Sequence, residues 1–484
     1  MSKKVLIIGA GLAGLSTGIY LQKQGIPTEI FEISGQAGGM CIAWERQGYR
    51  FDGCIHWMVG TKPNTPFNDL YREVHALEEE TVIHNAESIK TQINGKIYEI
   101  PMSLELFKNF LLTVSPEDSA KIEAFCREIG IMITTRMPAG APTSLIELLD
   151  VIKNSRGFLK LVRKYAGITV GEYTEAYQNP VLKALLYNLM PPQYSFFGLI
   201  MMLGTRMSGN AGYPMGGAYE VINRMEKHYR ELGGTLHFSS KVDKIIVEGG
   251  KATALESRRQ LYKADAIVAA CDMYDVLNNM LCSKYAHKQL DPLLESAELF
   301  SPILIVSFGL NRKLHIPFSQ IFECPEGIKT DSEKVCRYLS IRSFEFDPSS
   351  APENCSSVMV ILDSTLEYWK DLRNNDPEGY RRRKEELSLE VISALDRRIP
   401  GFKAAVAVTD VATPATYIRY ANLYKGSWEG FAPTPSAFKY NIRKKIDGVQ
   451  GLYLCGQWTT VGGGICSAVQ SGKEAAKAIT KYLK

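Results

Sequence analysis

A glycine-rich turn near the N-terminus constrains the fold of this chain more than any other feature. The apolar run 5–8 leads directly into Gly9, Gly11 and Gly14, and Glu32 follows the next apolar run. A continuous apolar run of this kind suits a parallel strand that is buried on both faces. A strand, a GxGxxG turn, a helix and a second strand ending in an acidic residue predict a dinucleotide-binding βαβ unit.

The glycines of this turn have separate physical tasks. Gly9 allows the tight turn, Gly11 lets a pyrophosphate approach the backbone, and Gly14 lets the helix pack closely on the strand. The free amides at the helix N-terminus and the positive end of its dipole attract phosphates. The carboxylate of Glu32 can accept hydrogen bonds from the ribose hydroxyls of an adenosine.

Composition and charge do not point to a nucleic-acid-binding protein. The chain has 484 residues, of which 45% are hydrophobic, and its net charge is only +4. This length predicts two or three domains. The dense basic run 381–384 lies in a predicted helix that Asp376 caps and Pro377 begins. Acidic residues follow the run at helical spacing, which favours a solvated face with ion pairs over an anion-binding site.

The cysteines and the N-terminal residues indicate an intracellular chain. The ten cysteines are scattered, without a CxxC pair or a His/Cys spacing typical of zinc sites. We therefore expect reduced thiols and no structural metal. Lys3 and Lys4 lead straight into the first predicted strand and its turn, without a secretory signal, so we expect a cytoplasmic protein.

One long stretch, 184–205, carries no charged residue. Pro191-Pro192 divides it, and each half is shorter than the roughly 20 apolar residues that a membrane span needs. A buried helix pair is the favoured interpretation, and the alternatives are a wall of the substrate site or a segment that dips into one leaflet. The nearby basic amphipathic segment 158–165 could rest on a membrane surface, which would make the protein peripheral to the membrane.

The order of strands, turns and helices predicts a discontinuous domain. The C-terminal end repeats the N-terminal pattern, with the apolar run 452–454, glycines at 462–464 and a predicted helix from about Ser467. Asn94-Gly95, between two short β segments, predicts a type I′ hairpin. We expect an α/β fold in which a Rossmann-like nucleotide domain closes around an inserted α+β substrate domain. The nucleotide domain would comprise 1–80, 205–290 and 430–484, and the substrate domain 81–204 and 291–429. Other strands are predicted at 236–238, 242–247, 252–255, 266–270, 303–308 and 358–362, and helices over much of 104–203 and at 218–232.

The chain also carries motifs of a known group of enzymes. They are the N-terminal turn with Glu32, Gly38-Gly39, the segment 213–217, Val242, and Gly456 with the glycines at 462–464. With these motifs the chain resembles the phytoene desaturase, carotenoid isomerase and retinol saturase group of FAD-dependent oxidoreductases.

Within this group the chain is most similar to the retinol saturases. The similarity is carried by the segment 45–57 and by Gly456-Gln457. The desaturases usually have an acidic residue in place of Gln457. They often have arginine where this chain has Met40, so the usual phosphate partner is missing here.

The resemblance implies an extended FAD that joins the two domains. Its adenosine would lie at Glu32, its pyrophosphate over Gly11 to Gly14, and its flavin would reach the inserted domain. Val242 would meet the adenine through its backbone, and Gly456 with Gln457 would face the ribityl and phosphate portion. The expected cofactor contacts are Gly9, Gly11, Leu12, Ala13, Gly14, Glu32, Gly38, Gly39, Met40, Val242, Gly456, Gln457, Gly464 and Ile465, the last two through backbone amides near the flavin pyrimidine ring.

Flavin chemistry at a carbon–carbon double bond couples hydride transfer to the gain or loss of a proton. His56 is the candidate proton-handling residue, because its motif would lie near the flavin and an imidazole can titrate near neutrality. A structural histidine that bonds a backbone carbonyl is an equally strong interpretation. Cys54 and Cys466 would also lie near the ring, with structural roles favoured. Tyr417, Arg419 and Tyr420 are candidates for the substrate side, although core packing is favoured for each.

The resemblance implies an apolar small-molecule substrate, an isoprenoid or polyene lipid. Only one GxGxxG with a following acid is present, so we expect no dedicated NAD(P)H domain, and electrons would be exchanged with a diffusing donor or acceptor. The saturase-like residues favour saturation of a double bond, with desaturation or isomerisation as alternatives. An amine or protoporphyrinogen oxidase would share this plan, as would a GDP dissociation inhibitor-like protein that binds prenyl groups without flavin chemistry. The intact phosphate-binding glycines argue against the inhibitor-like protein.

Overall fold

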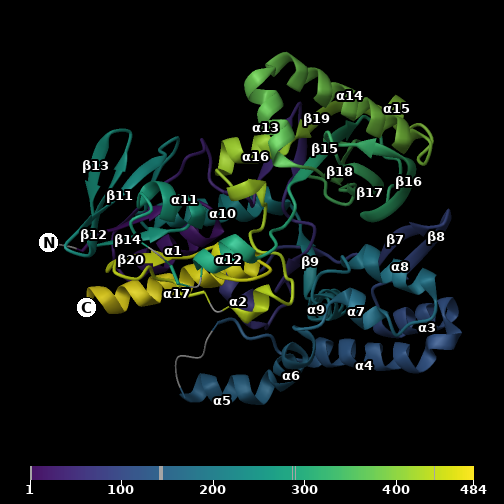
Figure 1. The fold of residues 1–484 in the computed structure, drawn as a ribbon, viewed down its shortest axis with the longest axis horizontal. Coiled ribbons are helices and arrows are strands. Elements are labelled where there is room, and N and C mark those ends of the chain that lie inside the picture. Colours follow the sequence, from purple (N-terminus) through teal and green to yellow (C-terminus); the bar gives the residue numbers. More distant parts are fainter. Residues whose placement is uncertain (1–2, 141–144, 286, 289, 441) are drawn as a thin grey trace.

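A five-stranded parallel sheet organises the nucleotide-binding part of the fold. The computed structural model describes residues 3–140, 145–285, 287–288, 290–440 and 442–484 (Figure 1). The strand order is β10-β2-β1-β14-β20, and every neighbouring pair is parallel. The sheet therefore draws its strands from three separate stretches of the chain, as the repeated strand–turn–helix pattern predicts. Its strands are β1 (Val5–Ile8), β2 (Thr28–Phe31), β10 (Thr235–His237), β14 (Ala266–Ala269) and β20 (Leu452–Leu454).

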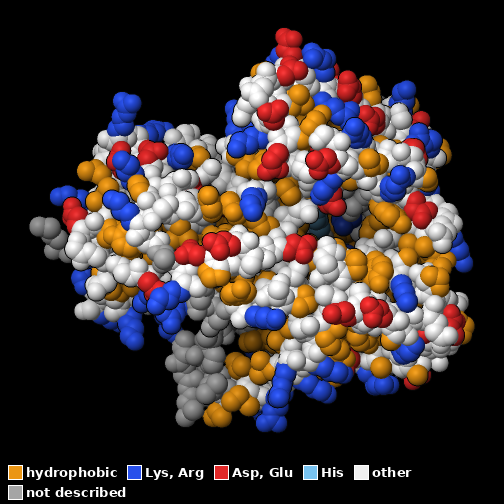
Figure 2. All heavy atoms as spheres, in the orientation of Figure 1, with side chains coloured by type: hydrophobic (Ala, Val, Ile, Leu, Met, Phe, Trp, Pro, Cys, Tyr) orange, Lys and Arg blue, Asp and Glu red, His pale blue; other side chains and the backbone are white. Residues whose placement is uncertain are grey.

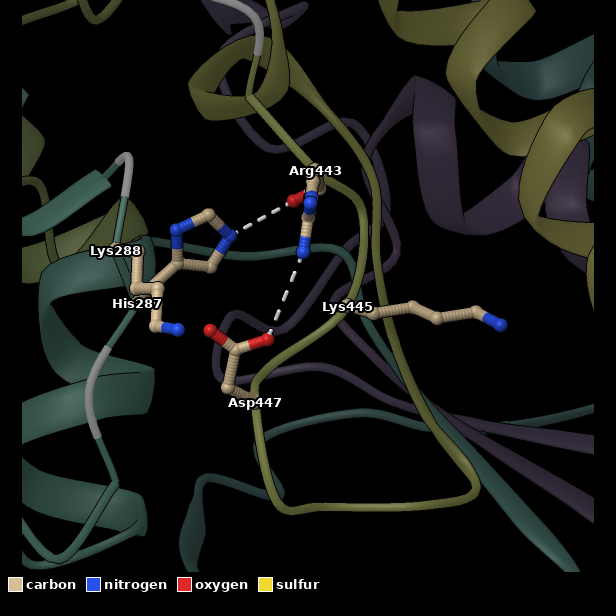
Figure 3. Close-up of a pocket in the computed structure, with 5 residues that line it drawn as sticks. All are labelled: His287, Lys288, Arg443, Lys445 and Asp447. Atoms are coloured by element: carbon tan, nitrogen blue, oxygen red, sulfur yellow. Dashed lines mark hydrogen bonds and ion pairs between the residues drawn. The ribbon is translucent and has the colours of Figure 1, made fainter.

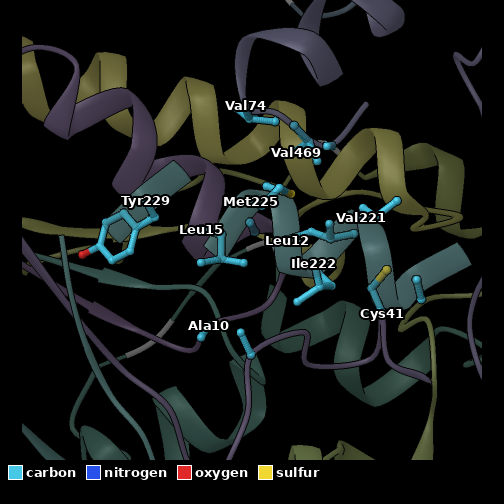
Figure 4. Close-up of a cluster of buried hydrophobic side chains, with 14 of the residues drawn as sticks. Ala10, Leu12, Leu15, Cys41, Val74, Val221, Ile222, Met225, Tyr229 and Val469 are labelled. Atoms are coloured by element: carbon cyan, nitrogen blue, oxygen red, sulfur yellow. The ribbon is translucent and has the colours of Figure 1, made fainter. Parts of the chain in front are cut away.

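Three helices pack closely beside this sheet, namely α1 (Leu12–Gln22), α10 (Gly217–Glu231) and α17 (Ile465–Leu483). A Cβ added to Gly472 would lie 2.5 Å from the carbonyl oxygen of Ala13, and one added to Gly18 would lie 2.6 Å from the ring of Tyr229. Glycine at both positions therefore lets α1 approach its neighbours. Figure 4 shows apolar side chains of all three helices meeting in one cluster, among them Leu15, Met225 and Val469.

A small antiparallel sheet covers a second hydrophobic core of this domain. It consists of β11 (Val242–Glu248), β12 (Lys251–Ser257) and β13 (Gln260–Lys263), in that order. Its apolar side chains pack with Leu6 and Ile8 of β1 and with α11 (Met273–Asp275) and α12 (Leu290–Ser296). The central strand β1 is thus buried on both faces, as its apolar sequence predicts.

The inserted part contains a seven-stranded sheet with the order β19-β15-β18-β17-β16-β7-β8. Asn94 and Gly95, with φ of 51° and 78°, connect β7 to β8, which agrees with the predicted type I′ turn. The helices α13, α14 and α15 pack against this sheet (Figure 1). The bounds are β7 (Ser88–Ile93), β8 (Lys96–Pro101), β15 (Ile303–Leu310), β16 (Ser319–Lys329), β17 (Val335–Ser343), β18 (Ser356–Asp363), β19 (Val406–Ala412), α13 (Leu366–Asn375), α14 (Pro377–Asp396) and α15 (Phe402–Ala405).

A group of helices lies beside the β7–β8 hairpin. Its members are α3 (Leu104–Val114), α4 (Ser119–Thr134), α5 (Leu145–Asn154), α6 (Arg156–Tyr165), α7 (Val170–Thr174), α8 (Pro180–Leu189) and α9 (Phe196–Met207). The uncharged stretch forms most of α8 and all but the end of α9, which are separated around Pro191-Pro192, and α9 is buried against α4. The prediction of burial is therefore confirmed for α9, whereas only Leu182, Leu185 and Leu186 are buried in α8. None of the helices within the described ranges is long and apolar enough to cross a membrane.

Several local predictions agree with the structure, and one boundary is wrong. The side chain of Asp376 accepts the backbone N–H of Gly379 at 2.8 Å and caps α14, where Arg383 pairs with Glu386 and Glu390. The last helix begins at Ile465 and not at about Ser467, because α17 starts directly after the glycine turn. The composition of 137–144, which is rich in Pro, Gly, Ala, Ser and Thr, predicts a break in the helices of 104–203, and its part 141–144 lies outside the described residues. The smaller elements are β3 (Ala43–Arg46), β4 (Tyr49–Asp52), β5 (Met58–Val59), α2 (Pro66–Glu73), β6 (Ile83–His84), β9 (Ala211–Pro214) and α16 (Pro414–Ala421).

Candidate functional site

The GxGxxG turn is held by close backbone contacts but leaves space above Gly11. A Cβ added to Gly9, whose φ is +98°, would lie 2.7 Å from the carbonyl oxygen of Ala270. One added to Gly14 would lie 1.9 Å from the carbonyl oxygen of Gly9. At Gly11 the nearest atom would be 3.7 Å away, so a ligand can approach its backbone. Gly11 is also the N-cap of α1 and provides no side-chain cap, so the first amides of the helix remain available to an anion.

Glu32 lies at the end of β2, beneath this turn. Its two carboxylate oxygens accept backbone N–H groups of Ala10, at 2.7 Å, and Ser34, at 2.8 Å. Burial raises the pKa of Glu32 above its ordinary value, and the backbone N–H groups oppose that rise. Each oxygen has a second lone pair, so the oriented carboxylate can still accept a ribose hydroxyl.

The other predicted contacts near the adenosine and pyrophosphate lie close to these two features. Gly38 donates its N–H to the carbonyl oxygen of Ala10 at 2.9 Å, and a Cβ added to Gly39 would lie 3.3 Å from the Cα of Gly11. Met40 follows and packs against the apolar core beside α1. Val242 is buried at the start of β11, two residues after Ser240, whose N–H bonds the carbonyl oxygen of Glu32.

The C-terminal glycines approach the same turn from the other side. Gly456, with φ of +102°, donates its N–H to Ser471, and a Cβ added to it would lie 3.7 Å from the Cβ of Ala13. Gln457 begins a short 3-10 turn. The glycines at 462–464 all have positive φ. Gly464 is the N-cap of α17, which begins at Ile465, and it provides no side-chain hydrogen bond to the helix. The helices α1 and α17 therefore pack closely against each other, and neither has a side-chain cap at its N-terminus.

A partly buried carboxyl group that sequence reasoning missed lies at the start of α17. The Cγ of Glu429 would be 2.4 Å from a Cβ added to Gly463, and its Oε1 would be 3.5 Å from one added to Gly464. Burial raises the pKa of Glu429 to about 8. Among the described residues it has no ion pair or side-chain hydrogen bond. The charge of Glu429 also raises the pKa of Cys54, after stronger effects of its hydrogen bond to Cys41 and of burial.

Cys466 is also part of this neighbourhood. Burial is the largest cause that raises the pKa of its thiol, and the charge of Glu429 adds to it. All ten cysteines are free, and no group of three or more metal-ligating side chains occurs in the described part of the chain. The only signal for Glu429 in the sequence is a single acid in the otherwise uncharged segment 426–436.

His56 does not titrate near neutrality, so the reason for its predicted role is wrong. Burial, and then the charges of Arg342 and Arg206, lower its pKa to about 3. Its Nε2 atom is buried and bonds none of the residues that the structure describes, so this atom does not make the carbonyl bond expected of a structural histidine. The turn before it is held by Asp52, which accepts the N–H groups of Cys54 and Ile55. The catalytic assignment of His56 stays a prediction.

The three residues proposed for the substrate side separate in the structure. Tyr417 is buried in the core, where burial raises the pKa of its hydroxyl group. Arg419 and Tyr420 lie on the same helix, α16, but are exposed, with the guanidinium group 5.3 Å from the ring centroid of Tyr420. The favoured explanation by core packing therefore fits Tyr417 and is wrong for Arg419 and Tyr420.

A small pocket elsewhere has no connection with these residues. Its volume is about 130 Å³, and it is lined by His287, Lys288, Arg443, Lys445 and Asp447 (Figure 3). His287 bonds the carbonyl oxygen of Arg443 at 2.8 Å, and Arg443 pairs with Asp447 at 3.9 Å. Protein groups thus satisfy these side chains, and none of the predicted site residues lines the pocket.

Comparison with known proteins identifies the family of this chain. The model of the family "Flavin containing amine oxidoreductase" matches residues 12–480. The chain belongs to this family. It is 23% identical to a lycopene-forming phytoene desaturase of Pseudescherichia vulneris over 100% of both chains, and 22% identical to an all-trans-retinol 13,14-reductase of Danio rerio over 93% of this chain and 82% of that protein. The structure of cyclohexylamine oxidase from Brevibacterium oxydans covers 100% of both chains with a TM-score of 0.61 at 14% identity, which shows a shared fold.

As a member of this family, the chain is an FAD-dependent oxidoreductase. The residues of the site fit FAD. Gly11 leaves space for a pyrophosphate, the uncapped N-termini of α1 and α17 offer amides to negatively charged groups, and Glu32 is oriented to bond a ribose. We expect the fourteen cofactor contacts named from the sequence to hold FAD, with Glu429 as an additional neighbour of its flavin end.

Proposed function

We propose that this FAD-dependent oxidoreductase acts on a carbon–carbon double bond of an apolar isoprenoid or polyene lipid, and that its reaction is saturation. The observation that carries the proposal is the enclosed Glu429 carboxyl group beside the glycine turn that begins α17. The similarity to a retinol reductase and a phytoene desaturase supports the substrate class. The segment 45–57 and Gln457 support saturation over desaturation.

The chain's own residues bind and orient the cofactor in this reaction. The amides at the N-terminus of α1 hold the pyrophosphate, and Glu32 holds the adenosine ribose. Bound FAD supplies the exchange of hydride with a carbon atom. The amides of Gly464 and Ile465 would hold the pyrimidine end of the flavin, where a helix N-terminus favours negative charge.

Glu429 handles the proton in this proposal. Saturation adds a hydride to one carbon and a proton to its neighbour. Because the pKa of Glu429 is raised to about 8, its carboxyl group holds a proton at neutral pH and can donate it. The carboxylate that remains then takes up a proton from solvent before the next reaction. Since only one GxGxxG turn is present, the electrons come from a diffusing donor.

The mass of the product tests the reaction and its direction. Chemically reduced enzyme is incubated anaerobically with all-trans-retinol, and oxidised enzyme with the same polyene. Saturation predicts a product two hydrogen atoms heavier from the reduced enzyme. A product two hydrogen atoms lighter from the oxidised enzyme would establish desaturation, and a product of equal mass that elutes separately from the substrate in chromatography would establish isomerisation. A flavin that changes its redox state only with amines would replace the proposal with an amine oxidase.

A surface on α5 and α6 supports peripheral contact with a membrane. Leu149, Ile152 and Leu159 are exposed there, although they are large and apolar. Lys160 and Arg163 lie beside Leu159 around a shallow hollow. Figure 2 shows apolar and basic side chains together at the lower edge of this face, over α5 and α6. Apolar side chains with flanking basic residues bind the interface of an anionic membrane, which would bring the enzyme to a lipid substrate.

A further inference from the structure

Two arginines of the inserted part, one buried and one partly buried, lack an acidic partner among the described residues. Arg206 lies near the C-terminal end of α9 and is 9% exposed, and Arg342 lies in β17. Within the described ranges, neither forms an ion pair. The guanidinium group of Arg206 is 5.3 Å from the ring centroid of Trp57, and that of Arg342 donates to the carbonyl oxygen of Ile341 at 2.9 Å. We call these two residues the arginine pair.

The charges of the arginine pair are costly in this position. Burial lowers the pKa of Arg206 to about 10, and burial with the charge of Arg206 lowers the pKa of Arg342 to about 9. A buried or partly buried cation without an anion is unfavourable. The chain pairs its arginines elsewhere, as Arg383 with Glu386 and Glu390 shows. Two arginines that lack acidic partners in this position therefore point to an anion that is supplied from outside the chain.

His56 adds an unsatisfied polar atom to this group. Its Nε2 is buried without a partner, and the charges of the arginine pair contribute to its low pKa. A neutral imidazole can donate one hydrogen bond, so the three side chains together offer several donors to one anion. Arg342 and His56 are partly exposed.

We propose that Arg206, Arg342 and His56 bind an anionic head group of the substrate, a carboxylate or a phosphate at the end of an apolar chain. This inference rests on the proposed function and narrows its substrate to an acidic amphiphile. The apolar residues Leu199, Ile200 and Leu203 precede Arg206 on α9. Arg206 and Arg342 come from α9 and β17, whereas the pyrophosphate of FAD is expected at the N-terminus of α1. The substrate is therefore the better source of the anion.

Binding to oxidised holoenzyme tests the inference without any reaction. The probes are all-trans-retinoate, all-trans-retinyl phosphate and neutral all-trans-retinol, and their dissociation constants are measured by quenching of protein fluorescence. The wild type is expected to bind at least one of the two anions about 10- to 100-fold more tightly than retinol. The anion that binds more tightly identifies the head group. Equal affinity for all three probes would overturn the inference.

Variants of β17 separate a specific effect from a loss of folding. Arg342→Met is expected to remove the preference for the anion, while leaving the affinity for retinol within about twofold. Arg342→Lys is expected to retain part of the preference for the anion, because lysine keeps the positive charge but lacks the planar guanidinium group. Arg337→Met on the same strand is the control, since Arg337 is exposed and donates to the carbonyl oxygen of Pro325. An unchanged preference in Arg342→Met would contradict the inference.

The melting temperature and the FAD content of Arg342→Met provide two further tests of the inference. Replacing an unpaired, partly buried cation is expected to raise the melting temperature of Arg342→Met in the absence of a lipid anion, which a merely structural arginine would not do. Loss of FAD from Arg342→Met would instead assign the arginine pair to the cofactor and overturn the inference. If the enzyme saturates retinol without a preference for anions, the inference fails and the proposed function stands. If the anion preference is present but no polyene reacts with the flavin, the proposed function fails.

Discussion

The side chain of Glu429 lies directly against the backbone of Gly463, because a Cβ at residue 463 would be 2.4 Å from the Cγ of Glu429 and 3.3 Å from its carboxyl carbon. Only glycine allows this approach, at a residue whose φ is +48°. The contact places an enclosed acid beside the N-terminus of α17, where the pyrimidine end of the flavin is expected. This relationship connects the cofactor site with a group that can deliver a proton.

Glu429→Gln is expected to slow saturation by about 10²- to 10⁴-fold, because the amide keeps the shape of the side chain but has no acidic proton. The rate of reoxidation of the reduced flavin by a polyene measures this effect. In the wild type the rate should fall as pH rises through about 8, where Glu429 loses its proton, and this limb should be absent from the variant. An unchanged rate in a variant that retains FAD would show that another group donates the proton.

The same carboxyl group makes the stability of the apoprotein depend on pH. The pKa of Glu429 is about 8 in the folded chain and 4.5 ordinarily, so between these values the unfolded chain releases a proton that the folded chain keeps. The free energy of unfolding should therefore fall as pH rises from about 4.5 to about 8. Urea unfolding at pH 5 and pH 8 should show a smaller fall for Glu429→Gln than for the wild type. Parallel losses in both proteins would contradict the raised pKa.

Gly14→Ala is expected to weaken the binding of FAD and to lower the free energy of unfolding by about 1–3 kcal/mol, because its Cβ would collide with the carbonyl oxygen of Gly9. Gly167→Ala is the matched control, since a Cβ there meets nothing within 4 Å. It should change stability by no more than about 0.5 kcal/mol. Equilibrium dialysis of FAD and urea unfolding measure the two effects. Full binding of FAD by Gly14→Ala would place the cofactor elsewhere.

The surface on α5 and α6 makes a prediction about membranes. Leu159→Asp should reduce cosedimentation with vesicles of phosphatidylcholine and phosphatidylglycerol, because it replaces an exposed apolar side chain between basic residues with a negative charge. Leu261→Asp changes an equally unusual exposed leucine, on β13, and should have no effect. The wild type should bind vesicles of phosphatidylcholine alone more weakly. Equal losses in the two variants would exclude α6 as the contact surface.

Local patterns predicted much of the fold. The apolar run before Gly9 became the central strand of the parallel sheet, Asn94-Gly95 became the hairpin turn, and Pro191-Pro192 separated two helices. Each feature depends on residues that are close in the sequence. The limits of the two domains and the contacts of FAD remain predictions, although the predicted contacts near the turn lie close together.

The polar groups of the substrate side could not be predicted in this way. Arg206, Arg342 and His56 are far apart in the sequence, and only the fold brings the charges of the two arginines near His56. The pKa of His56 depends on those two charges, so its protonation could not be inferred from its own motif. Glu429 lacks a motif and acquires its raised pKa from burial alone.

The anaerobic absorbance spectrum of the purified protein tests the central claim most directly. The spectrum is recorded before and after reduction, and retinoid and carotenoid polyenes are then added to each form. The account predicts flavin bands that bleach on reduction and return when a polyene is added to the reduced enzyme. Reduced flavin that no polyene reoxidises, or a protein without flavin bands even after incubation with FAD, would contradict it.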